Sequence, residues 1–159
     1  MAKKQQRIQV KGIEIVTFKK NEKDYISLTD IARYRSHSES DDIIKNWMRN
    51  RSTIEFLGLW EQINNPDFKP VEFDGFRNKA GSNSFVLSPS KRMNATKATG
   101  LFVKRGRYGG TYAHLDIAYE FASWISVEFK LFLIKEFQRL KEEENLRLAQ
   151  GWDIKRTLG

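Results

Sequence analysis

The chain has 159 residues, 40% of them hydrophobic, which suits one packed core but is short for two full domains. Lysine and arginine number 28 against 20 acidic residues, and the resulting net charge of +8 favours a polyanionic partner. The absence of cysteine excludes disulfides and thiolate metal sites, which fits a reducing compartment. No run approaches the roughly 20 apolar residues of a membrane span. We therefore expect a cytoplasmic protein that does not associate with a membrane.

The first elements in chain order are predicted to be β-strands. Residues 8–10 and 13–18 are rich in β-branched side chains and flank a lysine and a glycine at residues 11–12, which predicts a hairpin. A third short strand is expected near Tyr25. Residues 1–24 would then form a basic tail and an N-terminal hairpin ahead of the main domain.

Two short helices joined by a polar turn are expected next. Ser27 and Asp30 have the spacing of a capping box, so the first helix should start near Leu28. The second helix is predicted at residues 41–50, where acidic side chains in the first turn suit the helix dipole. Its apolar side chains share one face, so the opposite face carries cations and amides. These outward residues are Lys45, Asn46, Arg49 and Asn50.

A third helix is predicted directly after the second. Ser52 and Glu55 repeat the capping-box spacing and predict a helix over residues 53–63. The apolar spacing assigns this helix a structural role in the core. The side chains expected to be buried are Phe56, Leu57, Trp60 and Ile63.

The stretch between Asp74 and Asp116 contains no acidic residue. It is expected to hold an irregular insert, a strand at residues 84–87, and a short helix from Pro89 to Gly100. Its cations are Arg77, Lys79, Lys91, Arg92, Lys97, Lys104, Arg105 and Arg107. One charge sign gathered in a single stretch indicates a contact surface for a polyanion.

A basic hairpin is predicted at the end of this stretch, from strands at residues 101–103 and 111–113. Three glycines at its tip permit positive φ angles, which a tight connection requires. Arg105 and Arg107 find no acid in the tip to pair with, and Tyr108 stands beside them. The tip is therefore predicted to contact an anion.

The rest of the chain has the apolar spacing of packing helices. One helix is expected over residues 117–125 with Trp124 in the core, and Ser126 can cap a second that buries apolar residues over residues 129–140. Residues 145–159 continue this helix in charged form without a stop signal. We interpret them as a helical extension, truncated from a longer chain. The amphipathic helix over residues 129–148 is expected to be able to form a homodimer.

These elements predict an α+β fold with a winged helix-turn-helix-like core. A helix fits the major groove of double-stranded DNA, and a basic hairpin beside it can follow the backbone or enter the minor groove. We therefore expect residues 41–50 in the major groove and residues 103–111 beside them, on a common side of the molecule. Asn46 and Asn50 suit adenine edges, whereas Arg49 suits guanine or phosphate. The predicted DNA-contacting residues are Lys45, Asn46, Arg49, Asn50, Arg51, Lys91, Arg92, Lys104, Arg105, Arg107 and Tyr108.

Four sequence blocks in this order carry a family resemblance. They are SLTDIA at residues 27–32, WMRNR through EFLGLWE at residues 47–61, GRYGGTYAH at residues 106–114, and FKL through EFQRL at residues 129–140. Over about residues 25–144 the chain resembles the KilA-N domain family of phage, viral and bacterial DNA-binding proteins. The resemblance implies a winged helix-turn-helix core similar to that of fungal APSES domains, with duplex DNA as the ligand.

Two other functions compete with DNA binding. A metal-dependent nuclease would use Asp41 and Asp42, or His114 and Asp116, but helix capping explains these groups and no histidine cluster accompanies them. We therefore expect no enzyme activity, no cofactor and no metal. The other alternative is a protein-interaction adaptor that dimerises through the C-terminal helix.

The cations of the predicted interface also have a structural interpretation. Arg49 and Arg51 could make surface ion pairs with Asp42 or Glu55, which would contribute little to stability. RNA is less favoured than duplex DNA, because RNA binding would call for base-stacking aromatic side chains on a sheet surface and only Tyr108 and Tyr112 qualify.

Overall fold

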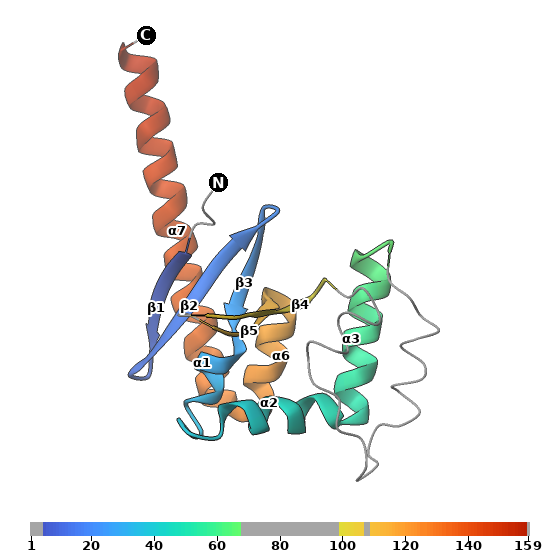
Figure 1. Cartoon of the computed structure of the whole chain (residues 1–159). Helices are drawn as coiled ribbons and strands as arrows, with labels where there is room; N and C mark the ends of the chain where they lie inside the picture. The colour runs from blue at the N-terminus through green and yellow to red at the C-terminus, as the bar shows by residue number, and fades with distance from the viewer. Residues whose placement is uncertain (1–4, 68–98, 107–108, 159) are drawn as a thin grey trace.

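The computed structural model describes residues 5–67, 99–106 and 109–158, with side chains as far as Gly151 (Figure 1). This described part contains five strands and five helices, so the α+β class is confirmed. The strands are β1 (Gln5–Val10), β2 (Ile13–Lys20), β3 (Lys23–Ser27), β4 (Leu101–Lys104) and β5 (Gly110–His114). The helices are α1 (Leu28–Ala32), α2 (Ser40–Arg49), α3 (Arg51–Asn64), α6 (Leu115–Ile125) and α7 (Val127–Leu158).

The first three strands form an antiparallel meander, which confirms the predicted hairpin and the predicted third strand. Lys11 and Gly12 connect β1 to β2 with φ of 50° and 81°. Asn21 and Glu22 connect β2 to β3 with φ of 53° and 64°. Positive φ at both central residues matches the two-residue turns whose twist follows that of the flanking strands.

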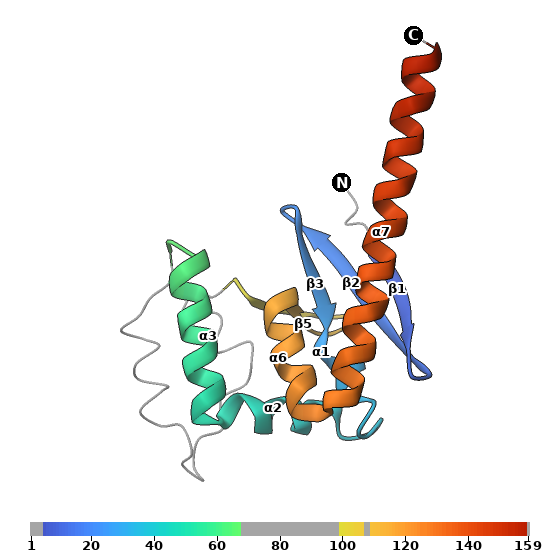
Figure 2. The same ribbon diagram turned by 180° about the vertical axis from the view of Figure 1, so that it is seen from behind.

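All five strands join one antiparallel sheet in the order β1-β2-β3-β5-β4. The N-terminal hairpin is therefore continuous with the rest of the sheet, because β3 pairs with β2 on one side and with β5 on the other. Helices α6 and α7 cover one face, as the view from behind shows (Figure 2). Ile15, Ile26 and Ala113 project from the strands into this layer, where they meet Phe121 and Phe129.

Helix α1 continues the sheet where β3 ends. The last pairs of β3 are Ile26 with Thr17 on β2 and Ser27 with Tyr112 on β5. One residue further along, the backbone amide of Val16 donates to Asp30 Oδ2 at 2.9 Å, and that of Thr111 donates to Thr29 Oγ1 at 3.0 Å. Side chains of α1 thus replace the missing strand as hydrogen-bond acceptors on both sides.

Of the predicted capping box of α1, the hydrogen bond accepted by the N-cap side chain is confirmed. Ser27 Oγ accepts a hydrogen bond from the amide of Asp30 at 3.1 Å. The Asp30 carboxylate instead serves the neighbouring strand and Arg33, whose Nη1 lies 2.6 Å from Asp30 Oδ1. Residues 27–32, the block SLTDIA of the family resemblance, therefore connect the sheet to the helices.

Several local predictions for α3 and α6 are wrong. Helix α3 begins at Arg51 with Asn50 as its N-cap, and no side chain caps it, so Ser52 does not start the helix. Ile63 is 72% exposed and Trp124 is 38% exposed, whereas both were expected in the core. Each lies in the last turn of its helix, and apolar spacing alone does not ensure that a neighbouring element covers that turn. The strand predicted at residues 84–87 and nearly all of the helix predicted at residues 89–100 lie outside the described residues.

Helix α7 agrees with its predicted start and buried stripe. Ser126 Oγ accepts from the amide of Phe129 at 3.1 Å, so the predicted cap is confirmed. The stripe is buried at Phe129, Leu133, Phe137 and Leu140. Lys141 Nζ then binds Asp24 Oδ1 at 2.8 Å, which ties the helix to the sheet. The C-terminal part of α7 projects away from the body of the molecule (Figures 1 and 2).

Candidate nucleic-acid interface

The outward face of α2 matches its sequence pattern. Ile43, Ile44, Trp47 and Met48 are buried, and the Trp47 ring centroid lies 4.9 Å from that of Phe121 on α6. Lys45 and Asn46 are exposed on the opposite face, and Arg49 is half-buried in the last turn. The helix is thus fixed on the core by one side and presents the other to solvent (Figure 1).

Asn50 and Arg51 belong to the junction between two helices rather than to α2. Asn50 has ψ of 136° and is at once the C-cap of α2 and the N-cap of α3. Arg51 is the first residue of α3, and its Nε lies 3.6 Å from Glu55 Oε1. Both partners are exposed, so this pair contributes little to stability. Arg51 therefore makes the surface ion pair with Glu55 that its structural interpretation expects.

The basic hairpin is confirmed, with β4 and β5 paired from Leu101 opposite Ala113 to Lys104 opposite Gly110. Gly106 has φ of 99°, and its carbonyl accepts from the amide of Gly109 at 3.0 Å. A Cβ on Gly110 would lie 2.8 Å from Thr29 Oγ1, so this position requires glycine. Glycines therefore permit both the turn of the hairpin and its close approach to α1.

The predicted contact residues of the hairpin differ in their exposure to solvent, and some lie outside the described residues. Arg105 is exposed at the tip. Lys104 is half-buried, and its Nζ lies 4.5 Å from the centroid of the Phe18 ring on the sheet. Arg107 and Tyr108 lie outside the described residues, as do Lys91 and Arg92 of the predicted helix after Pro89.

An aromatic cluster, separate from the main core, packs side chains of both hairpin strands against β2 and β3. The Tyr112 ring on β5 stacks on Phe102 at 5.3 Å between centroids and meets the edge of Phe18 at 4.9 Å. Tyr25 donates through its hydroxyl to the Thr99 carbonyl at 3.0 Å. Burial raises the pKa of Tyr25 and of Tyr112 above the usual value. This cluster gives the hairpin a rigid base.

A buried carboxylate that the sequence did not single out anchors the start of β4. Glu61 on α3 is 3% exposed and accepts from the amides of Gly100 at 2.7 Å and Thr99 at 3.0 Å. The side-chain amide of Asn65 donates to the same carboxylate at 3.0 Å. Burial of a charged group is tolerated when several donors satisfy it, as they do here. The sequence signal for this buried role was the position of a glutamate within the apolar stripe of a predicted helix.

His114 has the structural role expected of it. Its Nδ1 accepts from the amide of Asp116 at 3.1 Å and so caps α6. Burial lowers the pKa of His114, which keeps Nδ1 an acceptor. The Asp116 carboxylate accepts from Trp60 Nε1 at 3.0 Å. Within the described residues no group of three metal-ligating side chains occurs, and no helix there is long and apolar enough to cross a membrane.

Helix α1 connects the two parts of the candidate interface. It packs against α2 on one side and against β5 on the other. The bond from Thr111 to Thr29 fixes the root of the hairpin on α1, and Ile31 is fully buried beneath it. The exposed face of α2 and the hairpin are therefore both attached to one short helix.

Comparison with known proteins assigns most of the chain to one family. The family model of the KilA-N domain matches residues 8–143. The match begins in β1 and ends in α7, so it includes the N-terminal hairpin as well as the core. KilA-N domains are generally DNA-binding and are not typically enzymes. No curated protein and no solved structure matches the chain.

Proposed function

Because the chain belongs to the KilA-N domain family, we propose that it binds double-stranded DNA through the exposed face of α2 and the β4–β5 hairpin. The observation that carries this proposal is the attachment of both elements to α1, through packing on α2 and the bond from Thr111 to Thr29. A surface that is rigid before binding loses less conformational entropy when it meets its ligand. The proposal assigns the fold a winged helix-turn-helix mode of docking.

Helix α2 supplies the groove-reading face in this proposal. An α-helix fits the major groove of B-DNA, where the amide of Asn46 can read an adenine edge. Arg49 suits guanine or a phosphate, and exposed Lys45 suits a phosphate. The acidic residues of α2, Asp41 and Asp42, lie in its first turn, away from Arg49 in its last. The C-terminal half of the helix would therefore approach the DNA most closely.

The hairpin supplies the second contact. Arg105 is exposed at its tip, where its guanidinium could contact a phosphate backbone or enter a minor groove. Lys104 would contact the backbone from the sheet side, and Arg51 would exchange its weak pair with Glu55 for a phosphate. Asn50 at the helix junction completes the described contacts. Lys91, Arg92, Arg107 and Tyr108 remain sequence-based parts of the proposal.

Salt dependence of duplex binding tests this proposal. Lys45→Ala and Arg105→Ala should each weaken binding to a duplex of random sequence and lower the slope of log K against log salt by about 0.9, because each removes one phosphate contact. Lys135→Ala is the matched control, since Lys135 is an exposed helical lysine on α7, away from the proposed contacts. Slopes equal to that of the wild type in both test variants would overturn the proposal.

A homodimer through α7 is the second candidate, favoured by the exposed Leu146 and Leu148 on the part of the helix that projects from the body. Light scattering on the whole chain and on a version ending at Lys141 tests it. A dimeric mass that becomes monomeric after truncation is expected. An unchanged mass would exclude this helix as the dimer contact.

A further inference from the structure

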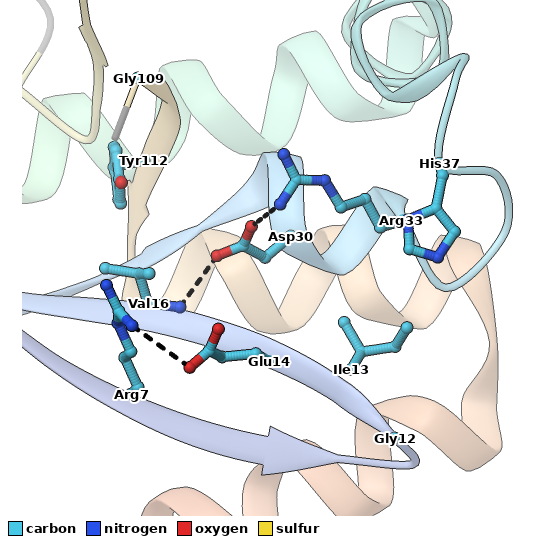
Figure 3. A pocket seen from close by; sticks show the side chains of 10 residues that line it. All are labelled: Arg7, Gly12, Ile13, Glu14, Val16, Asp30, Arg33, His37, Gly109 and Tyr112. Carbon is cyan, nitrogen blue, oxygen red and sulfur yellow. Dashed lines mark hydrogen bonds and ion pairs between the residues drawn. The ribbon is translucent and has the colours of Figure 1, made fainter. Parts of the chain in front are cut away.

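A polar cleft of about 440 Å³ opens beside the root of the hairpin (Figure 3). Its walls come from three parts of the chain: the β1–β2 hairpin, α1 with the turn that follows it, and the start of β5. The charged or polar side chains at its rim are Arg7, Glu14, Asp30, Arg33 and His37, and Gly109 of the basic hairpin closes one side. The cleft therefore adjoins the proposed DNA contact.

Arg33 is held at the mouth of this cleft in one orientation. Its Nη1 donates to Asp30 Oδ1 at 2.6 Å, while Asp30 Oδ2 accepts from the Val16 amide at 2.9 Å. The Asp30 side chain is 9% exposed and that of Arg33 is 42% exposed. A guanidinium has five N–H donors, and the bond to Asp30 uses a single nitrogen. The Arg33 guanidinium keeps N–H donors that this bond does not use, and its planar shape suits two-point binding of phosphate.

A second arginine stands across the cleft. Arg7 Nη1 lies 3.5 Å from Glu14 Oε1, and both side chains are about half exposed. An ion pair of this length and exposure contributes little, so an arriving phosphate can share the guanidinium. The acids Glu14 and Asp30 offset the two arginines in total charge. The affinity of the cleft for phosphate would thus come from oriented donors rather than from net charge.

On the basis of the proposed function, we infer that the cleft binds a phosphate group of the DNA backbone, with Arg33 as the principal donor and Arg7 as the second. Gly109 of the basic hairpin lines the cleft, so a DNA backbone bound along the hairpin would pass beside it. The interface then has a third contact, built on α1 and β1. This contact would position the duplex and would not depend on its sequence.

A pair of neighbouring arginines provides a matched test. Arg33→Gln removes the cleft donor, while Arg35→Gln makes the same change two residues later. Arg35 faces the end of α6, where Nη2 is 3.4 Å from the Ile125 carbonyl and the guanidinium lies over Trp124. Arg33→Gln should lower duplex affinity several-fold on every sequence and reduce the salt slope by about 0.9. Arg35→Gln should bind as the wild type does.

The outcomes separate this inference from the function on which it rests. If Arg33→Gln keeps the wild-type slope while Arg105→Ala lowers it, the cleft is not a phosphate site and DNA binding stands. If the wild-type protein does not bind duplex DNA, the proposed function fails first. Circular dichroism checks that each variant folds. If Arg33→Gln unfolds, Arg33→Lys is the deciding variant, because it keeps the positive charge but loses the paired N–H donors of the guanidinium. An affinity of Arg33→Lys equal to that of the wild type would overturn two-point binding.

Discussion

The hydrogen bond between Thr29 and the root of the basic hairpin can be removed almost without a change of shape. Thr29→Val replaces the acceptor Oγ1 by a methyl group of similar size, and the amide of Thr111 then loses the partner that it reaches at 3.0 Å. Thr29 and Thr111 are 7% and 6% exposed, so water cannot easily take the place of the hydroxyl. A buried donor left without an acceptor costs about 1–3 kcal/mol. For a domain of this size, each kcal/mol lowers Tm by roughly 2–4 °C.

Amide hydrogen exchange distinguishes this effect from a simple loss of packing. Thr29→Ser keeps the hydroxyl but loses a methyl group, which costs about 0.8 kcal/mol by itself. We expect the Thr111 amide to exchange slowly in the wild type and in Thr29→Ser, and much faster in Thr29→Val. Equally slow exchange in all three proteins, with Tm unchanged in the valine variant, would refute the assigned bond.

The same variant tests whether α1 positions the hairpin for DNA. If it does, Arg105→Ala should weaken duplex binding less in the Thr29→Val background than in the wild type, because a misplaced hairpin no longer delivers Arg105 to the phosphate. Residues that act together give such non-additive double-mutant cycles. Full additivity of the two changes would indicate that Thr29 affects stability alone.

Three further predictions concern the support of β4 and α6. Glu61→Ala leaves the buried donors of Gly100 and Asn65 without their acceptor and should lower the free energy of unfolding in urea by about 3 kcal/mol or more; a loss below about 1 kcal/mol would contradict the anchoring role. Gly100→Ala would place a Cβ 2.5 Å from Ile117 Cδ1, so we expect overpacking to cost about 1–3 kcal/mol in thermal unfolding, and an unchanged Tm would show that the site can expand. The pKa of His114 is lowered by burial, so the unfolded chain protonates first as the pH falls, and stability should decline from about pH 6.5 downward through the folded pKa. His114→Gln should flatten that part of the stability profile relative to the wild type, and parallel profiles would argue against the assignment.

Features that depend on short stretches of sequence were predictable. The hairpin at residues 11–12 follows from a lysine and a glycine between β-branched runs, and the structure has positive φ at both residues. The amphipathic pattern of α2 placed Trp47 inside and Lys45 outside, as observed. In each case the backbone conformation and the apolar period are set by residues close together in the chain.

Other features arise from residues that meet only after folding. Thr29 contacts a strand 82 positions later, and Glu61 anchors residues 38 and 39 positions away. No local pattern distinguishes Thr29 from an ordinary capping residue, and the local signal for Glu61 was its place in the apolar stripe of α3. The apolar period was also misleading at Ile63, because it shows which side of a helix is apolar and not whether another element covers it.

The sequence by itself indicated most of the described elements, their apolar faces and the concentration of positive charge, because propensity and periodicity act over a few residues. The tertiary structure decided which of those charged side chains are held in place and which other side chains lie next to them. Arg33 and Arg7 line one cleft because β1, α1 and β5 adjoin it, and that adjacency depends on the order of strands in the sheet. Strand order is a property of the whole chain, since it follows from which pairings bury the most apolar surface together.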